Sequence, residues 1–267
     1  APYVQTTPSG GADPFNITVT TFGDADCYAS EIAAAAARWE SILTSGFAST
    51  TIDFVDGACE VNAPTRRYAI DDLEIAINIM PIDGAGGTLG MAGPCYLVGG
   101  TRPVFGMMQL DIADIAGLRS SGRLVDTLTH EMGHILGIGT MWGGAGLLAG
   151  GDADPVFTGT HAVASWNELG GTGPVPVEDT GGSGTRLAHW RESVFDQELM
   201  TGWLEYGRAN PISAVTIASL KDLGYSVDAS KKDPYSLPAG LRWGALVSGF
   251  GAGEPLHTEP ITPIAIG

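Results

Sequence analysis

Alternating apolar and polar positions predict a strand and then a helix near the start of the chain. Residues 17–22 alternate and are rich in β-branched side chains, as half-buried strands are. In the stretch that follows, the apolar period lengthens to that of a helix with one buried face, formed by Ile32, Ala36, Trp39 and Leu43. Residues 51–55 and 73–79 again have strand patterns. This order predicts an α/β (α+β) fold, in which helices back a twisted, mostly parallel sheet.

The middle of the chain predicts one more pair of strands before a second long helix. Residues 83–100 are rich in glycine, which suits an antiparallel edge strand with bends at 87–94 as well as it suits a surface loop. An edge strand can accept an extended peptide. Residues 104–111 predict a further strand, and a helix begins within residues 122–125.

After Gly137 the periodicity weakens. Residues 139–184 are irregular and glycine-rich, with one predicted helix at 162–169. Helical spacing returns at 212–223, where Gly224 marks the end of the helix. We therefore expect an N-terminal subdomain over 1–136, a C-terminal subdomain over 137–228 and a tail over 229–267.

Composition narrows the class of partner. The 267 residues carry a formal net charge of −17, which argues against nucleic acid or an anionic membrane as a partner. Glycines interrupt the longest apolar stretch, so we expect no membrane span. The chain starts at Ala1 without a leader, which is compatible with secretion. We expect a secreted monomer.

The three cysteines lie in the first part of the chain and lack the spacing of a zinc or redox motif. One disulfide and one free thiol would fit an exported protein. Of the three pairings among Cys27, Cys59 and Cys95, we favour Cys59 with Cys95 because both border predicted sheet elements. The sequence leaves the pairing open.

The helix that begins near residue 122 contains the motif His-Glu-x-x-His. His130 and His134 are four residues apart, so they share a helix face and can bind one metal ion. Glu131 then lies beside the ion, where it can act as a general base. The apolar positions lie on the opposite side of the helix: Val125, Leu128, Met132, Ile135 and Leu136.

A catalytic zinc needs one more protein ligand and an open position for water. In the metzincin pattern, a third His follows three residues after a turning glycine; Gly137 fits, but Thr140 occupies the ligand position. The remaining histidines are His161, His189 and His257. A downstream glutamate is the other possibility, with Glu168, Glu192 and Glu198 as candidates, although none lies on a convincing partner helix.

A second island of sequence carries a resemblance. It begins with His189-Trp190 and ends with Glu198-Leu199-Met200, so that Met200 comes 11 residues after His189. In this order of motif helix, insertion and Glu-Leu-Met, the chain resembles the leishmanolysin-like zinc metallopeptidases of the metzincin clan.

The resemblance implies a metzincin-like catalytic domain with a backing helix, an active-site helix, an irregular C-terminal subdomain and a C-terminal helix. It assigns zinc ligands, a general base and a Met-turn residue, and it makes the glycine-rich strand the rim that binds substrate. The residues so assigned are His130, His134 and His189 for zinc, Glu131 as base, Met200 for the Met-turn, and Leu89, Gly90, Met91 and Ala92 for substrate. The residue two after Met200 is Gly202, where some relatives have a zinc-binding tyrosine.

We therefore expect a zinc-dependent endopeptidase that cleaves proteins or peptides. Two alternatives remain: a catalytically silent, zinc-stabilised binding or adhesion module, and a zinc hydrolase of non-peptide substrates.

Asp152 and Asp154 could bind a structural calcium ion through their carboxylate oxygens, although solvated surface charge is the simpler interpretation of these two residues. Trp190 and Trp203 are expected to pack in the core rather than to line a specificity pocket.

Overall fold

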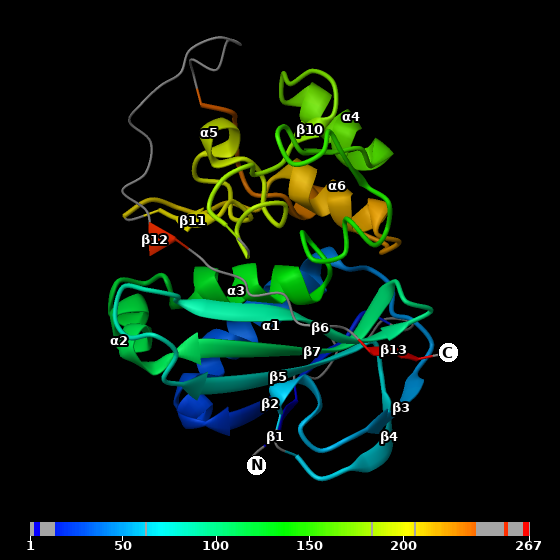
Figure 1. Cartoon of the computed structure of the whole chain (residues 1–267), viewed down its shortest axis with the longest axis vertical. Coiled ribbons are helices and arrows are strands. Elements are labelled where there is room, and N and C mark those ends of the chain that lie inside the picture. Colours follow the sequence, from blue (N-terminus) through cyan, green and yellow to red (C-terminus); the bar gives the residue numbers. More distant parts are fainter. Residues whose placement is uncertain are drawn as a thin grey trace.

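A mostly parallel sheet forms the base of the molecule in the computed structural model (Figure 1). The structure describes residues 3–5, 14–61, 63–182, 184–205, 207–238, 254–255 and 264–266. The strand order is β1-β2-β5-β7-β6-β13; β2, β5 and β7 are parallel neighbours, and β6 is antiparallel to β7. The strands are β1 Tyr3–Gln5, β2 Ile17–Gly23, β5 Leu73–Met80, β6 Gly90–Val98, β7 Arg102–Asp111 and β13 Ile264–Ile266. The predicted strands at 17–22, 73–79 and 104–111 are confirmed.

Two long helices lie side by side over one face of the sheet (Figure 1). They are α1, Ala29–Ile42, and α3, Leu124–Ile135. Both were expected from their apolar spacing, and their buried faces belong to the main hydrophobic core. Inside this core, the indole nitrogen of Trp39 donates to the carbonyl of Thr129 at 2.8 Å, which fixes α1 against α3. A short helix between β7 and α3, α2 Ile112–Ser120, was not predicted.

The opposite face of the sheet carries a hairpin. Its strands are β3, Thr50–Phe54, and β4, Arg66–Ile70, which pair only with each other among the described residues. The strand predicted at 51–55 therefore exists, but the inference that it belongs to the main sheet is wrong. Ile52 and Phe54 point into a second core cluster below the sheet, whereas the alternate residues of β3 face solvent.

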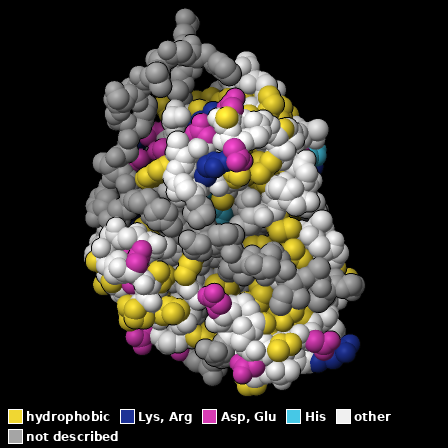
Figure 2. Space-filling model, in the orientation of Figure 1, with side chains coloured by type: hydrophobic (Ala, Val, Ile, Leu, Met, Phe, Trp, Pro, Cys, Tyr) yellow, Lys and Arg dark blue, Asp and Glu magenta, His cyan; other side chains and the backbone are white. Residues whose placement is uncertain are grey.

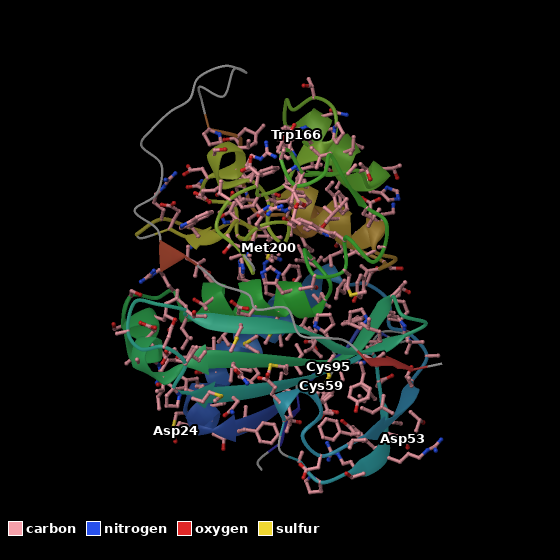
Figure 3. All side chains as sticks on the ribbon, viewed as in Figure 1. Asp24, Asp53, Cys59, Cys95, Trp166 and Met200 are labelled. Carbon is pink, nitrogen blue, oxygen red and sulfur yellow. A yellow bond between two sulfur atoms is a disulfide. The ribbon has the colours of Figure 1, made fainter. Side chains whose placement is uncertain are left out.

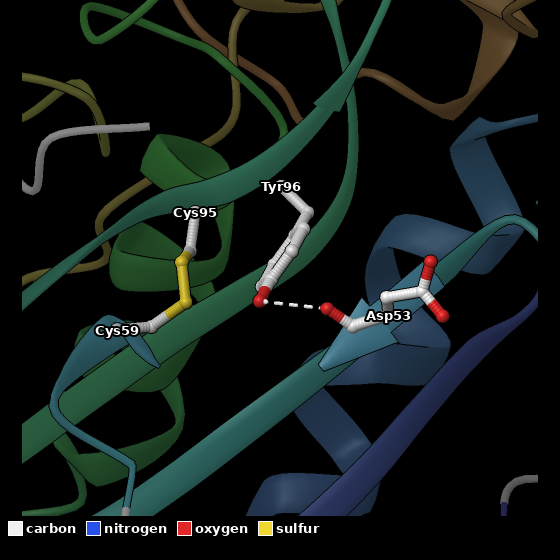
Figure 4. The surroundings of a disulfide bond; sticks show 4 residues. All are labelled: Asp53, Cys59, Cys95 and Tyr96. Carbon is white, nitrogen blue, oxygen red and sulfur yellow. Dashed lines mark hydrogen bonds between the residues drawn. A yellow bond between two sulfur atoms is a disulfide. The ribbon is translucent and has the colours of Figure 1, made fainter. Parts of the chain in front are cut away.

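The disulfide fastens this lower layer to the sheet. Cys59, in the short 3-10 helix Ala58–Glu60 that follows β3, is bonded to Cys95 of β6 (Figure 4). Beside it, the Tyr96 hydroxyl donates to the Asp53 carbonyl at 3.4 Å. The favoured pairing is confirmed, and Cys27 is free and exposed.

The segment after α3 folds above that helix from short elements (Figure 1). α4 and α6 pack together there and confirm the helices predicted at 162–169 and 212–223. The bounds are β8 Leu148–Ala149, β9 Val156–Phe157, α4 Thr160–Glu168, β10 Val175–Pro176, α5 Glu192–Phe195, β11 Trp203–Leu204 and α6 Ala214–Asp222. Two further 3-10 helices span Asp24–Tyr28 and Ala229–Lys231. None of the helices in the described ranges is both long and apolar enough to cross a lipid bilayer.

Most of the predicted tail over 229–267 lies outside the described residues. Its two described strands return to the main body: β12, Glu254–Pro255, pairs with β11, and β13 pairs in parallel with Tyr96–Val98 of β6. β6 is therefore not the outermost strand along its second half, because β13 lies outside it. The loop alternative for residues 87–94 is wrong from Gly90 onward.

Candidate metal centre

Helix α3 places the first two histidines together. His130 and His134 lie one turn apart on the face turned away from the apolar stripe, and their Nε2 atoms are 2.8 Å apart. Both side chains are fully buried. The site therefore lies between α3 and the segment folded above it.

The chain turns sharply where α3 ends. Gly137 has φ 109°, a left-handed conformation that suits glycine. Thr140, which stands where an uninterrupted metzincin motif has its third histidine, donates its hydroxyl to the His134 carbonyl at 2.6 Å. Thr140 thus closes the end of α3 and does not join the histidines.

The long segment after this turn comes back to its starting point. A Cβ atom on Gly139, which has φ 76°, would lie 1.9 Å from the carbonyl oxygen of Ala188, so the two backbones touch. Next to this contact, the rings of Trp142 and Trp190 pack with their centroids 4.4 Å apart. The returning chain therefore delivers His189 to the histidines of α3.

The three imidazoles form a triangle that could hold a metal ion. The Nε2 atom of His189 lies 3.1 Å from those of both His130 and His134. Nitrogens bound tetrahedrally to zinc at about 2.0 to 2.1 Å would lie about 3.3 to 3.4 Å apart, so a small movement of the rings would accommodate the ion. In Figure 3, Met200 lies directly above α3.

The outer nitrogen of each ring is fixed by a backbone carbonyl. The Nδ1 atoms of His130, His134 and His189 donate to Leu199 at 2.6 Å, Ile138 at 2.9 Å and Thr185 at 2.8 Å. With Nδ1 protonated, a neutral ring presents a bare lone pair at Nε2. Three lone pairs that converge at these distances repel one another unless a cation lies between them, and this donor set fits zinc.

Burial favours the neutral form that a metal needs. It lowers the pKa of His130 to about 3, with the nearby His189 as a second cause. Burial also lowers the pKa of His134, assisted by its two imidazole neighbours. These two rings are therefore ready to bind a cation near neutral pH without first losing a proton.

Glu131 is buried beside the triangle without a hydrogen-bond partner on either carboxylate oxygen among the described residues. Burial raises its pKa to about 8. The neighbouring strand comes close, since a Cβ on Gly90 would lie 3.5 Å from a carboxylate oxygen of Glu131. A buried carboxyl that titrates near neutral pH is suited to proton transfer.

Met200 packs directly against α3. It is fully buried, and its sulfur would lie 2.8 Å from a Cβ added to Gly133 of α3. Only the missing side chain at Gly133 allows this approach.

The strand predicted to bind substrate is the first part of β6, which packs against α3. Leu89, Gly90 and Ala92 are buried and Met91 is partly exposed. Gly90, Met91 and Ala92 pair with Leu110, Gln109 and Met108 of β7.

The other candidates for the third ligand lie elsewhere. His161 and Glu168 are exposed on α4, and Glu198 turns its carboxylate to the backbone of Met200. Glu192 groups with Asp196 and Glu205 instead, in an acidic cluster where Arg208 pairs with two of the three carboxylates. His257 lies outside the described residues.

The suggested calcium ligands are engaged in ion pairs. Asp152 pairs with Arg186 at 2.8 Å and Asp154 with Arg191 at 2.9 Å, so nothing supports a calcium site there. Trp190 is buried among aromatic rings, as expected. The carbonyl groups that hold the histidines were not foreseen, because any residue type can supply a backbone oxygen.

Comparison with known proteins agrees with the motifs. A family model described as leishmanolysin matches residues 62–248. A leishmanolysin homolog of Crithidia fasciculata is 27% identical over 186 residues, which are 66% of this chain and 27% of that protein. A leishmanolysin-like peptidase of Drosophila melanogaster is 34% identical over 89 residues, 33% of this chain and 12% of the fly protein.

The chain thus matches about a quarter or less of the length of these relatives. The family model, by contrast, covers well over half of the chain. The matched residues include both the His-Glu-x-x-His motif and the stretch from His189 to Met200. On this match, the chain belongs to the leishmanolysin family of metallopeptidases.

Proposed function

We propose that the chain is a zinc-dependent endopeptidase in which His130, His134 and His189 hold the metal. The observation that carries this proposal is the triangle of three Nε2 atoms. In each of the three rings, the other nitrogen, Nδ1, is bonded to a backbone carbonyl. Bound zinc supplies Lewis acidity, which lowers the pKa of water and polarises a carbonyl group. Three neutral ligands leave the full charge of the ion available for this effect.

Glu131 is the proposed general base. Its carboxyl lies on α3 directly beside a metal ligand, and its pKa of about 8 is close to working pH. It takes the proton of the attacking water and returns it to the departing amine. A bound cation favours the ionised carboxylate and so lowers this pKa toward the value that a base needs.

Met200 is the proposed Met-turn residue, and its packing against Gly133 supports the helix that carries two ligands. Two residues later the chain has Gly202, which brings no side-chain donor to the site. Negative charge that develops on the substrate carbonyl is therefore stabilised by the metal and not by a side chain at position 202.

Substrate is proposed to bind in extended form along Leu89–Ala92. β13 already pairs with the second half of β6, which supports the ability of this edge to accept a strand. Leu89 and Ala92 are buried in the fold, so this rim would bind a peptide chiefly through its backbone. Recognition of this kind tolerates many substrate sequences.

Further expectations belong to the same proposal. The protein acts on extracellular proteins or peptides as a monomer, with subdomains over 1–136 and 137–228. The disulfide is typical of an oxidising compartment.

On the face drawn in Figure 2, acidic side chains are scattered and basic ones are few, which disfavours nucleic acid as a partner. A silent binding module would have no need for the buried, unpaired carboxyl of Glu131.

The test is cleavage of an unfolded protein, such as labelled casein, by the whole chain. Cleavage should stop when zinc is removed with a chelator and return when zinc is added. His189→Ala should lose bound zinc and activity together, whereas His161→Ala, at an exposed position on α4, should keep both. A His189→Ala variant with normal zinc content and turnover would remove His189 from the site.

A further inference from the structure

A second buried carboxylate connects the segment above α3 to the C-terminal helix. Glu198 is fully buried. One of its oxygens accepts from the backbone N–H of Met200 at 2.6 Å, and the other accepts from the backbone N–H of Ser213 at 2.9 Å and from the hydroxyl of Thr216. Burial raises the pKa of Glu198, and these three hydrogen bonds oppose that rise. All three partners donate, so the side chain serves here as an acceptor.

The bond to Met200 leads directly to a histidine of the metal centre. The N–H of Met200 and the C=O of Leu199 belong to one peptide group, and no peptide bond among the described residues is cis. In a trans peptide these two groups point in opposite directions. The N–H donates to Glu198, and the C=O accepts from Nδ1 of His130 at 2.6 Å. Glu198, the peptide and His130 therefore form a continuous chain of hydrogen bonds.

Such a chain polarises its members. A carboxylate on the N–H side makes the carbonyl of the same peptide a stronger acceptor, because hydrogen bonds in series reinforce one another. A stronger acceptor at Nδ1 raises the basicity of Nε2, as a carboxylate bonded directly to a metal-binding histidine does. Here one peptide group stands between the carboxylate and the imidazole.

The same carboxylate also reaches the third ligand segment. The Thr216 hydroxyl that donates to Glu198 accepts from the indole nitrogen of Trp190 at 2.8 Å. Trp190 follows His189, and its backbone N–H donates to the carbonyl of Met200 at 3.0 Å. Glu198 thus ties together the backbone around Met200, helix α6 and the residue next to His189.

We propose that Glu198 is a positioning residue of the metal centre, which orients and polarises the Leu199–Met200 peptide so that His130 presents its Nε2 atom to zinc. This inference rests on the proposed function, because it assumes that the three histidines bind a metal. It assigns to Glu198 a role through His130 and not contact with the ion.

The test compares Glu198→Gln with wild type in the whole chain. The amide has the same shape, but its NH₂ group must face a donor, either the N–H of Met200 or the pair formed by Ser213 and Thr216. We expect the dissociation constant for zinc, measured by competition with a chromogenic chelator, to rise by about 10- to 100-fold. The visible spectrum of the cobalt-substituted protein should also change, and kcat should fall while KM is retained.

Asp72→Asn is the matched control. Asp72 is another buried carboxylate. It lies in the turn between β4 and β5 and accepts hydrogen bonds from the backbone N–H groups of Asn16 and Phe47. Its variant should lose stability but keep the zinc affinity and the cobalt spectrum of wild type. If Glu198→Gln fails to fold, Thr216→Val, which removes one donor to Glu198, should weaken zinc binding, and Thr216→Ser should restore it.

The outcomes separate the two proposals. A wild-type chain that binds zinc tightly, together with a folded Glu198→Gln or Thr216→Val protein of unchanged zinc affinity and cobalt spectrum, overturns the role of Glu198 alone. Equal loss of affinity in Asp72→Asn overturns it as well, because the effect would then follow general destabilisation. A wild-type chain that binds no zinc overturns the proposed function itself, and this inference with it.

Discussion

Replacing Glu131 with Gln should stabilise the metal-free protein at neutral and alkaline pH. The carboxyl is fully buried, and neither oxygen has a hydrogen-bond partner among the described residues. Burial raises its pKa from 4.5 to about 8. Glutamine has the same shape and never carries the charge that this environment disfavours.

The sign and size of the effect follow from the two pKa values of Glu131. Below pH 4.5 the carboxyl is protonated in both states, so the two proteins should be equally stable. Between pH 4.5 and 8 the unfolded chain releases a proton that the native state keeps, and wild type loses about 1.4 kcal/mol per pH unit relative to the variant. The difference stops growing above pH 8, at no more than about 5 kcal/mol.

The assay is urea unfolding of both proteins in excess chelator at several values between pH 4.5 and 9. The free energy of unfolding of Glu131→Gln minus that of wild type should be near zero at the acid end and should increase with pH. Glu168→Gln, at an exposed position on α4, should show no such increase. A difference that does not vary with pH, or a variant less stable than wild type at pH 8, would show that burial does not raise the pKa of Glu131 in the native state.

Three further predictions concern two close contacts beside the candidate metal centre and the disulfide on the opposite side of the sheet. Gly133→Ala places a Cβ 2.8 Å from the sulfur of Met200, and thermal unfolding should report a loss of about 1 to 3 kcal/mol from overpacking; an unchanged melting temperature would contradict it. Gly139→Ala drives a Cβ into the Ala188 carbonyl and should reduce zinc retention, whereas Gly146→Ala, with a similar φ of 69° and open space around it, should retain zinc; equal zinc content in both would argue against the contact. Replacing both cysteines of the disulfide, which are 36 residues apart, with serine should cost about 4 kcal/mol of stability and leave zinc affinity unchanged; a parallel loss of zinc would show that the lower layer shapes the site.

The sequence predicted those parts of the fold whose signal is local. The apolar spacing of α1 and α3 and the alternation in β2 appear in short windows and need no knowledge of partners. β4 was missed because its sequence, Arg66–Ile70, places two arginines in solvent and buries only its last residue fully. α2 was missed because only Ile115 and Leu118 of its residues are buried, too few to mark a face.

Long-range pairing explains the error over β3. Its pattern gives one buried face but does not say which surface that face covers, and Ile52 and Phe54 pack below the sheet instead of extending it. The strand at Gly90 was only half recognised for a similar reason. Glycine suits both a bent strand and a loop, and pairing with β7 decided between them.

The candidate site likewise combines residues predicted from local spacing with residues that depend on long-range contacts. His130, Glu131 and His134 follow from spacing on one helix, whereas spacing alone left His189 open among several candidates. It meets the others only because Gly139 lets the chain return against Ala188, a contact that no short window contains. The Leu199 carbonyl and the side chain of Glu198 complete the arrangement through backbone hydrogen bonds, which leave no mark in the pattern of residues.

Cleavage of an unfolded protein by wild type and by Glu131→Gln, at matched zinc content, is the measurement that decides whether the chain is a peptidase with Glu131 as its base. We predict that the variant binds one zinc as wild type does and loses about 10²- to 10⁴-fold in kcat, the usual contribution of a general base. Cleavage by the zinc-loaded variant at the wild-type rate would contradict the role of Glu131. No cleavage by zinc-loaded wild type would contradict the assignment of the chain as a peptidase.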